Sequence, residues 1–189
     1  VHFTSTDGHA TLPADMTLTN GSGSFSETLD SAGSQTITAT DTVDHTVTGT
    51  SNAETVTAGA ATHLSVNLPA NGTAGTPGSV TVTALDAFGN VATSYSGTVH
   101  FTSSDGLATL PADMTLTNGV GTFSDTLDTA GNQTVTATDT VSPAITGTSN
   151  PETVAAAAAT HFVVTIPANG AAGTPGSVTV TALDAFGNV

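Results

Sequence analysis

An internal repeat constrains the fold of this chain more than any other feature. In this chain of 189 residues, the sequence of 1–91 recurs at 99–189. The alignment has no gap and pairs Val1 with Val99 and Val91 with Val189. Only 20 of the 91 aligned pairs differ. A unit of this length is typical of one β-sandwich domain, and it is longer than the units of helical repeats or β-helices. We therefore expect a tandem array of similar domains.

Turns and strand-like runs set the phase of this array. One complete unit is expected at 61–158. Before it, 1–60 would form an incomplete unit that holds only the later strands, and after it, 159–189 would hold only the first two. Because Val1 begins within a strand-like run, we interpret the chain as a segment of a longer array.

Alternating apolar residues predict the strands. Val80, Val82 and Ala84 alternate with Thr81 and Thr83, as in a strand with one buried face. Other runs of this kind follow, separated by Gly and Asn clusters that are typical of turns. About seven short strands are expected per 98-residue unit. This pattern favours an all-β fold of tandem immunoglobulin-like β-sandwich domains.

Three runs carry a resemblance to a known family: 79–90 (SVTVTALDAFGN), 96–105 (SGTVHFTSSD) and 129–139 (TAGNQTVTATD). They resemble the bacterial immunoglobulin-like tandem repeats of large surface and secreted proteins, the Big domains of the invasin and intimin type. The resemblance covers the whole unit and recurs in each copy. It implies a β-sandwich stalk outside the cell that spaces or displays an adhesive or catalytic end domain.

Composition excludes several functions. The chain has no Lys or Arg against 15 acidic residues, so its net charge is −15 and it cannot neutralise phosphates. Nucleic-acid binding and attachment to anionic membranes are therefore not expected. No apolar run approaches the length needed for membrane insertion. With 37% hydrophobic and only 8% charged residues, a packed core is still feasible.

Catalysis is not expected from this segment. There is no GxSxG nucleophile elbow and no HxH or CxxC spacing. The His residues that repeat are the pairs His2/His100 and His63/His161, which alternate with inward apolar neighbours. We expect them on the solvent face, and we expect no catalytic site.

Calcium is the one cofactor that the sequence offers. The candidate ligands are Asp86 and Asn90, in the loop after the second strand, with Asp105 at the end of the third. Carboxylate and amide oxygens are what calcium requires. However, an Asp-x-x-x-Asn loop is also a common turn in which Asp caps backbone N–H groups, and we favour that alternative.

Asp125 and its counterpart Glu27 present a separate problem. Asp125 has the parity of the inward residues Phe123 and Leu127, yet no Lys or Arg exists to pair with it. Burying an unpaired carboxylate is costly. We expect a bulge that turns Asp125 outward; the alternative is a protonated or ion-bound side chain.

The sequence favours a non-catalytic spacer in a rod-like stalk of an extracellular, adhesin-like bacterial surface protein. Its expected partners are the neighbouring repeats. The alternative is a binding module that recognises a glycan or surface partner through its loops or through calcium, but one Tyr and no Trp offer no aromatic platform for sugars. The loop 81–90 is unchanged in the next copy, which suits a spacer. Head-to-tail self-association through the incomplete ends is also expected.

Overall fold

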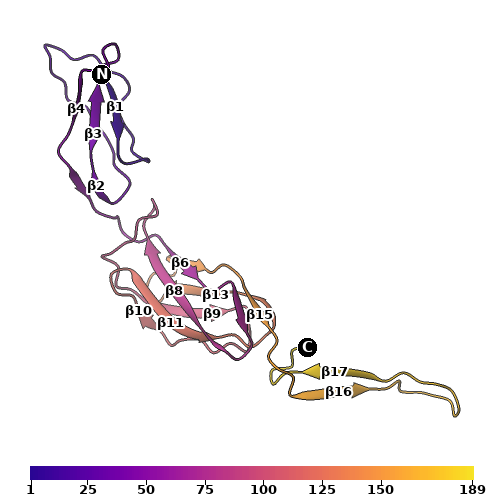
Figure 1. Ribbon diagram of the computed structural model, residues 1–189. Coiled ribbons are helices and arrows are strands. Elements are labelled where there is room, and N and C mark those ends of the chain that lie inside the picture. The colour runs from indigo at the N-terminus through magenta and orange to yellow at the C-terminus, as the bar shows by residue number, and fades with distance from the viewer. The chain divides into compact units, whose positions relative to one another are not determined.

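The computed structural model describes all residues, Val1–Val189, and contains strands and no helix. The predicted all-β fold is therefore confirmed. The chain forms two compact units, each described separately below. Unit 1 comprises Val1–Ala61 with Leu85–Ala92, and unit 2 comprises Thr62–Ala84 with Thr93–Val189. Figure 1 labels most of the strands.

Unit 2 contains a sandwich made of three sheets with strand orders β11-β8-β6, β10-β9-β13-β14 and β12-β15-β7. Its strands are β6 (His63–Asn67), β7 (Asn71–Thr73), β8 (Pro77–Leu85), β9 (Thr98–Ser103), β10 (Met114–Thr115), β11 (Val120–Thr126), β12 (Gly131–Gln133), β13 (Val135–Asp139), β14 (Thr146–Thr148) and β15 (Glu152–Ala155). All pairs are antiparallel except β15 with β7, which is parallel. This is an immunoglobulin-like β-sandwich.

The core of the sandwich follows the predicted alternation. On β8, Val80, Val82 and Ala84 are fully buried, whereas Thr81 and Thr83 are half-buried. The other buried apolar side chains of the sandwich are Leu64, Val66, Leu68, Ala74, Val99, Phe101, Leu116, Leu127, Val135, Ala137 and Val154. None of residues 1–61 contributes a buried apolar side chain.

The sandwich has more strands than the seven or so expected, because parts of the chain pass from one sheet to another. Strands β12 and β13 are separated by Thr134 alone, yet they belong to different sheets. Strands β14 and β15 likewise belong to different sheets. Each long run is thereby divided into two short strands.

Unit 1 has two small sheets, β1-β3-β4 and β2-β5. Its strands are β1 (His2–Ser5), β2 (Gly33–Gln35), β3 (Ile37–Thr40), β4 (Thr48–Thr50) and β5 (Glu54–Val56). The segment 22–28 occupies the position of β11 in the repeat but forms no strand. In unit 2, β11 pairs along its length with β8, and no counterpart of β8 covers this segment in unit 1.

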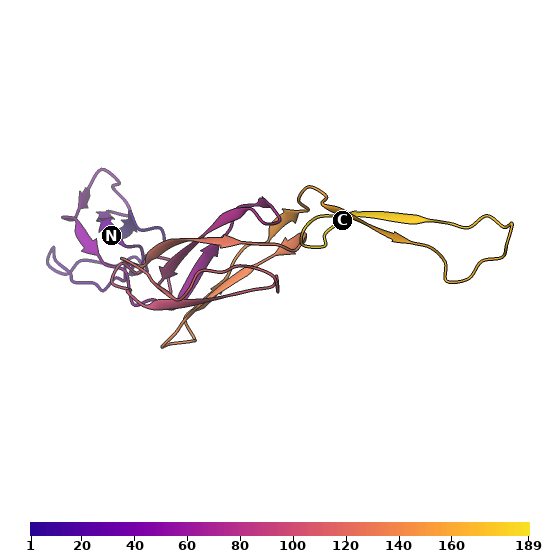
Figure 2. The ribbon, with the colours of Figure 1, turned by 90° about the horizontal axis from the view of Figure 1, so that it is seen from below.

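Two further strands, β16 (His161–Thr165) and β17 (Thr179–Leu183), complete unit 2. They pair with each other as an antiparallel hairpin, visible in Figure 2 in orange and yellow. They correspond in sequence to β6 and β8. The expected boundaries at 60/61 and 158/159 stay a prediction.

Candidate functional site

The loop that follows β8 is organised by Asp86. Its side chain is 2% exposed, and its Oδ1 accepts hydrogen bonds of 2.9 Å from the backbone N–H groups of Phe88 and Asn90. Gly89 allows the turn, because its φ of +86° lies in the left-handed region that glycine tolerates best. The result is a tight loop that closes directly after the strand.

The same carboxylate also holds the segment that follows β5. The N–H of Gly59 donates to Asp86 Oδ2 at 2.8 Å, and the side-chain amide of Asn90 donates to Oδ2 at 3.0 Å. Burial by itself raises the pKa of Asp86, but the hydrogen bonds from Asn90, Gly59 and Phe88 outweigh it and lower the pKa to about 2. Asp86 is therefore a stably ionised acceptor.

Asn90 extends this network to a third segment. Its Nδ2 donates to the carbonyl oxygen of Asp30 at 2.7 Å, and its Oδ1 accepts the N–H of Ala32 at 2.8 Å. One side-chain amide thus pairs with both a donor and an acceptor of the segment 30–32. In the expected phase, this segment belongs to the preceding repeat.

Asp7 fixes the segment that Asn90 binds. It is 4% exposed and accepts the N–H groups of Asp30 at 2.6 Å and Ser31 at 2.9 Å, together with the Ser31 hydroxyl at 2.6 Å. The hydrogen bonds from Ser31 are the main cause of a pKa for Asp7 well below its usual range. The carbonyl of Asp30 and the N–H of Ala32 are thereby presented to Asn90.

The whole arrangement recurs in unit 2. Asp184, 1% exposed, accepts the N–H groups of Phe186, Asn188 and Ala157 at 2.8–2.9 Å. Asn188 donates to the carbonyl oxygen of Asp128 and accepts the N–H of Ala130, both at 2.8 Å. Asp105 takes the place of Asp7 and accepts the Asp128 N–H at 2.6 Å, the Thr129 N–H at 2.9 Å and the Thr129 hydroxyl at 2.6 Å.

We call each set of bonds a junction clamp. The first joins 86–90 to Gly59 and 30–32, and the second joins 184–188 to Ala157 and 128–130. The two clamps differ at two positions: Gly59 and Ser31 of the first are replaced by Ala157 and Thr129 in the second. Both differences keep the bonds, because the donors are a backbone N–H and a hydroxyl. Each clamp links residues about sixty positions apart.

The calcium candidates are only partly brought together. Asp86 and Asn90 bond to each other in unit 1, whereas Asp105 belongs to unit 2 and faces Asp128 and Thr129. Calcium requires six to eight oxygen ligands, but both oxygens of Asp86 face N–H donors. No group of three or more His, Asp or Glu could hold a metal ion. This donor set favours turn capping, and calcium binding stays a prediction.

Asp125 corrects the expectation of a bulge. Strand β11 pairs regularly with β8, and Asp125 lies opposite Gly78 with its side chain 2% exposed. Its Oδ1 has no hydrogen-bond partner. Glycine leaves room for the carboxylate, because a Cβ at Gly78 would lie 3.2 Å from Oδ1. The bulge prediction was wrong, because the side chain of Asp125 points into the sandwich from a regular strand.

Glu152 is a second buried carboxyl, and sequence reasoning missed it. It is 5% exposed, and a side chain at Gly72 would overlap its Oε1. Burial raises the pKa of Asp125, and burial followed by the charge of Asp125 raises the pKa of Glu152. Glu152 has the same strand parity as buried Val154, and that alternation was the signal that could have revealed it.

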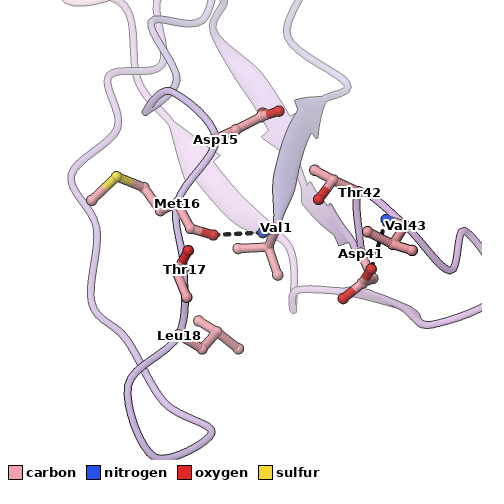
Figure 3. Close-up of a pocket in the computed structure, with 8 residues that line it drawn as sticks. All are labelled: Val1, Asp15, Met16, Thr17, Leu18, Asp41, Thr42 and Val43. Atoms are coloured by element: carbon pink, nitrogen blue, oxygen red, sulfur yellow. Dashed lines mark hydrogen bonds between the residues drawn. The ribbon is translucent and has the colours of Figure 1, made fainter.

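Figure 3 shows a cavity of about 400 Å³ in unit 1. It is lined by Val1, Asp15, Met16, Thr17, Leu18, Asp41, Thr42 and Val43. The amino group of Val1 donates to the Met16 carbonyl at 2.6 Å, and the Val43 N–H donates to Asp41 at 2.8 Å. The lining offers no nucleophile, base and orienting group in mutual contact. The chain also has no helix long and apolar enough to cross a lipid bilayer.

No protein-family model matches the chain, and no curated protein matches it. Among solved structures, it is similar to FdeC, an adhesin of Escherichia coli, with 23% identity and a TM-score of 0.47 over 83% of this chain. It is also similar to a glycosyl hydrolase family 2 member of Bacteroides cellulosilyticus, with 15% identity and a TM-score of 0.45 over 68% of this chain. The chain covers 52% of the former and 18% of the latter.

Proposed function

We propose that this chain is a non-catalytic spacer, a segment of a rod-like stalk in an extracellular bacterial surface protein. The observation that carries the proposal is the recurrence of the junction clamp. Two buried carboxylates, Asp86 and Asp184, bind the turn after the second strand and the segment before the first, with nearly the same distances. Two amides, Asn90 and Asn188, bind the segment some sixty residues earlier.

A clamp of this kind suits a mechanical role. Hydrogen bonds to an ionised, buried carboxylate are stronger than bonds between neutral groups and fix the direction of the attached segments. Each clamp connects the loop after one repeat's second strand to the linker and to a loop of the preceding repeat. The partners of each repeat are then its neighbours in the same chain, and the array gains length without flexible joints.

Small-angle X-ray scattering of the monomeric fraction tests this function. We expect an elongated particle whose maximum dimension shortens, and whose profile shows greater flexibility, when Asn90→Ala opens the first clamp. Asn67→Ala is the matched control, because Asn67 is exposed and makes only a 3.4 Å contact with Ser65. A compact profile for the unaltered chain would contradict the stalk.

A further inference from the structure

A glycine socket lies beside the second junction clamp. Gly75 stands between β7 and β8 with a φ of +75°, a conformation that side chains rarely adopt. A Cβ at this position would come within 2.5 Å of Cζ and 2.6 Å of Cε2 of Phe186. The edge of the aromatic ring therefore lies against Gly75 and leaves no room for a side chain between them.

The socket is fixed to the sandwich on two sides. The N–H of Ala74 donates to the carbonyl oxygen of Ala155 at 2.9 Å, and the N–H of Gly75 donates to that of Leu127 at 3.1 Å. Ala74 and Leu127 are 3% and 4% exposed. Because buried contacts and backbone bonds hold the turn, the socket is a rigid part of the sandwich surface.

Phe186 reaches the socket from the loop 184–188, which also carries the clamp. Asp184 accepts the N–H of Phe186 at 2.9 Å, which fixes the backbone that bears the ring. Two residues later, Asn188 donates to the carbonyl oxygen of Asp128 at 2.8 Å. Asp128 directly follows the residue whose carbonyl holds the socket, so the ring and the amide bind neighbouring points of the same sandwich.

Both partners of this contact recur in the repeat. Gly173 corresponds to Gly75 and has a φ of +82°, and Phe88 corresponds to Phe186. In the expected phase, Gly75 and Phe88 belong to one repeat. Each repeat therefore carries a socket for the repeat after it and a ring for the repeat before it, and the same contact can form at every junction of an array.

We propose that Gly75 is the docking socket for the aromatic ring of the following repeat, and that the ring and the clamp amide together fix the angle between the two repeats. The amide of Asn188 alone would let its loop pivot about that point. The ring of Phe186 is a second anchor two residues away and removes the pivot. This inference rests on the proposed spacer function, because a stalk without flexible joints needs such a contact.

Nuclear magnetic resonance in solution tests the contact itself. Gly75 and Gly173 have similar φ values, and nothing lies within 4 Å of a Cβ at Gly173. We expect the ring current of Phe186 to displace the α-proton resonances of Gly75 from those of Gly173. Phe186→Leu should remove this displacement, and Phe88→Leu, the matched control, should preserve it. Resonances of Gly75 that Phe186→Leu leaves unchanged would overturn the proposal.

Hydrogen exchange tests whether the ring stabilises the clamp. Asn188 binds the Ala130 amide, and Phe186→Ala should speed the exchange of that amide about tenfold, the scale expected for losing a partly buried aromatic ring. Gly75→Asn should act similarly, because Asn tolerates a positive φ but places a Cβ against the ring. Gly173→Asn is the matched control, since its Cβ would face open space.

The double variant separates the contact from backbone strain at Gly75. If ring and socket act as one contact, Gly75→Asn should add little to the exchange rate on the Phe186→Ala background. Fully additive effects, or an Ala130 amide that Phe186→Ala leaves unchanged, would overturn the proposal. A compact scattering profile would instead contradict the stalk, whereas the resonances of Gly75 and the exchange of Ala130 report the contact whatever the shape of the particle.

Discussion

The side-chain amide of Asn188 donates a hydrogen bond of 2.8 Å to the carbonyl oxygen of Asp128, sixty residues earlier in the chain. The same amide bonds to Asp184, and its oxygen accepts the N–H of Ala130. A single residue therefore ties the loop after β17 to a loop of the preceding sandwich. The equivalent bond from Asn90 to Asp30 is 2.7 Å long.

Removing this amide should loosen the second clamp. Asn188→Ala abolishes three side-chain bonds, and because each is worth about 1 kcal/mol net, we expect a loss of about 1–3 kcal/mol in local stability. Hydrogen exchange measures this directly, as faster exchange of the Ala130 and Ala157 amides. Asn169→Ala is the control, because Asn169 is exposed. Unchanged protection of both amides would contradict the clamp.

The sequence predicted the parts of this fold that depend on local alternation. Val80, Val82 and Ala84 are buried as expected, because a strand with one buried face has a period of two. The partners of Asp105, which the sequence analysis grouped with Asp86, were not predictable. Asp105 binds the N–H of Asp128, 23 residues later, and nothing in a sequence shows which loops meet.

Two other features escaped prediction for physical reasons. The contact of the clamp with the segment before the first strand uses the backbone N–H of Gly59 and Ala157, which any residue except proline supplies, so this contact leaves no side-chain signature. Asp125 was expected to turn outward because a buried, unpaired carboxylate is costly. Its space is provided by Gly78 on the neighbouring strand, and that pairing depends on the register of β11 against β8.

Asp125 should make the sandwich more stable in mild acid. Because burial raises the pKa of folded Asp125 above the usual value of a free Asp, its contribution to stability is present below that usual value and is lost as pH rises through the raised pKa. Asp86 and Asp184, with pKa values of about 2, act oppositely and lose their contribution as pH falls from about 4 toward 2. Stability should therefore be greatest at mildly acidic pH.

Asp125→Asn tests this assignment. At pH 7.5, we expect the free energy of unfolding of the variant to exceed that of the unaltered chain by about 1–3 kcal/mol, so that the variant unfolds at a higher temperature. This difference should shrink by pH 4. Glu27→Gln controls for the loss of one charge, because Glu27 is the exposed counterpart of Asp125. A lower melting temperature for Asp125→Asn than for the control at pH 7.5 would count against the account.

Salt should stabilise the folded chain. With a net charge of −15 and no Lys or Arg, the folded state repels itself, and screening relieves this. A gain of about 1 kcal/mol in moderate sodium chloride would raise the melting temperature by roughly 2–4 °C. The N–H donors around Asp86 predict no further gain from millimolar calcium at constant ionic strength. A calcium increment that Asp86→Ala removes would instead support the metal site.

The distance between equivalent points of successive repeats tests the junction clamp most directly. Val43 and Val141 occupy the same position of the repeat and are 89% and 88% exposed, and the chain has no Cys, so Cys at both positions takes spin labels selectively. Pulsed electron resonance on the labelled chain, diluted with unlabelled chain, gives the distance distribution. We expect one narrow peak that broadens when Asn90→Ala is added. A broad distribution with the clamp intact, or a peak that Asn90→Ala leaves unchanged, would contradict the claim that the clamp fixes one repeat on the next.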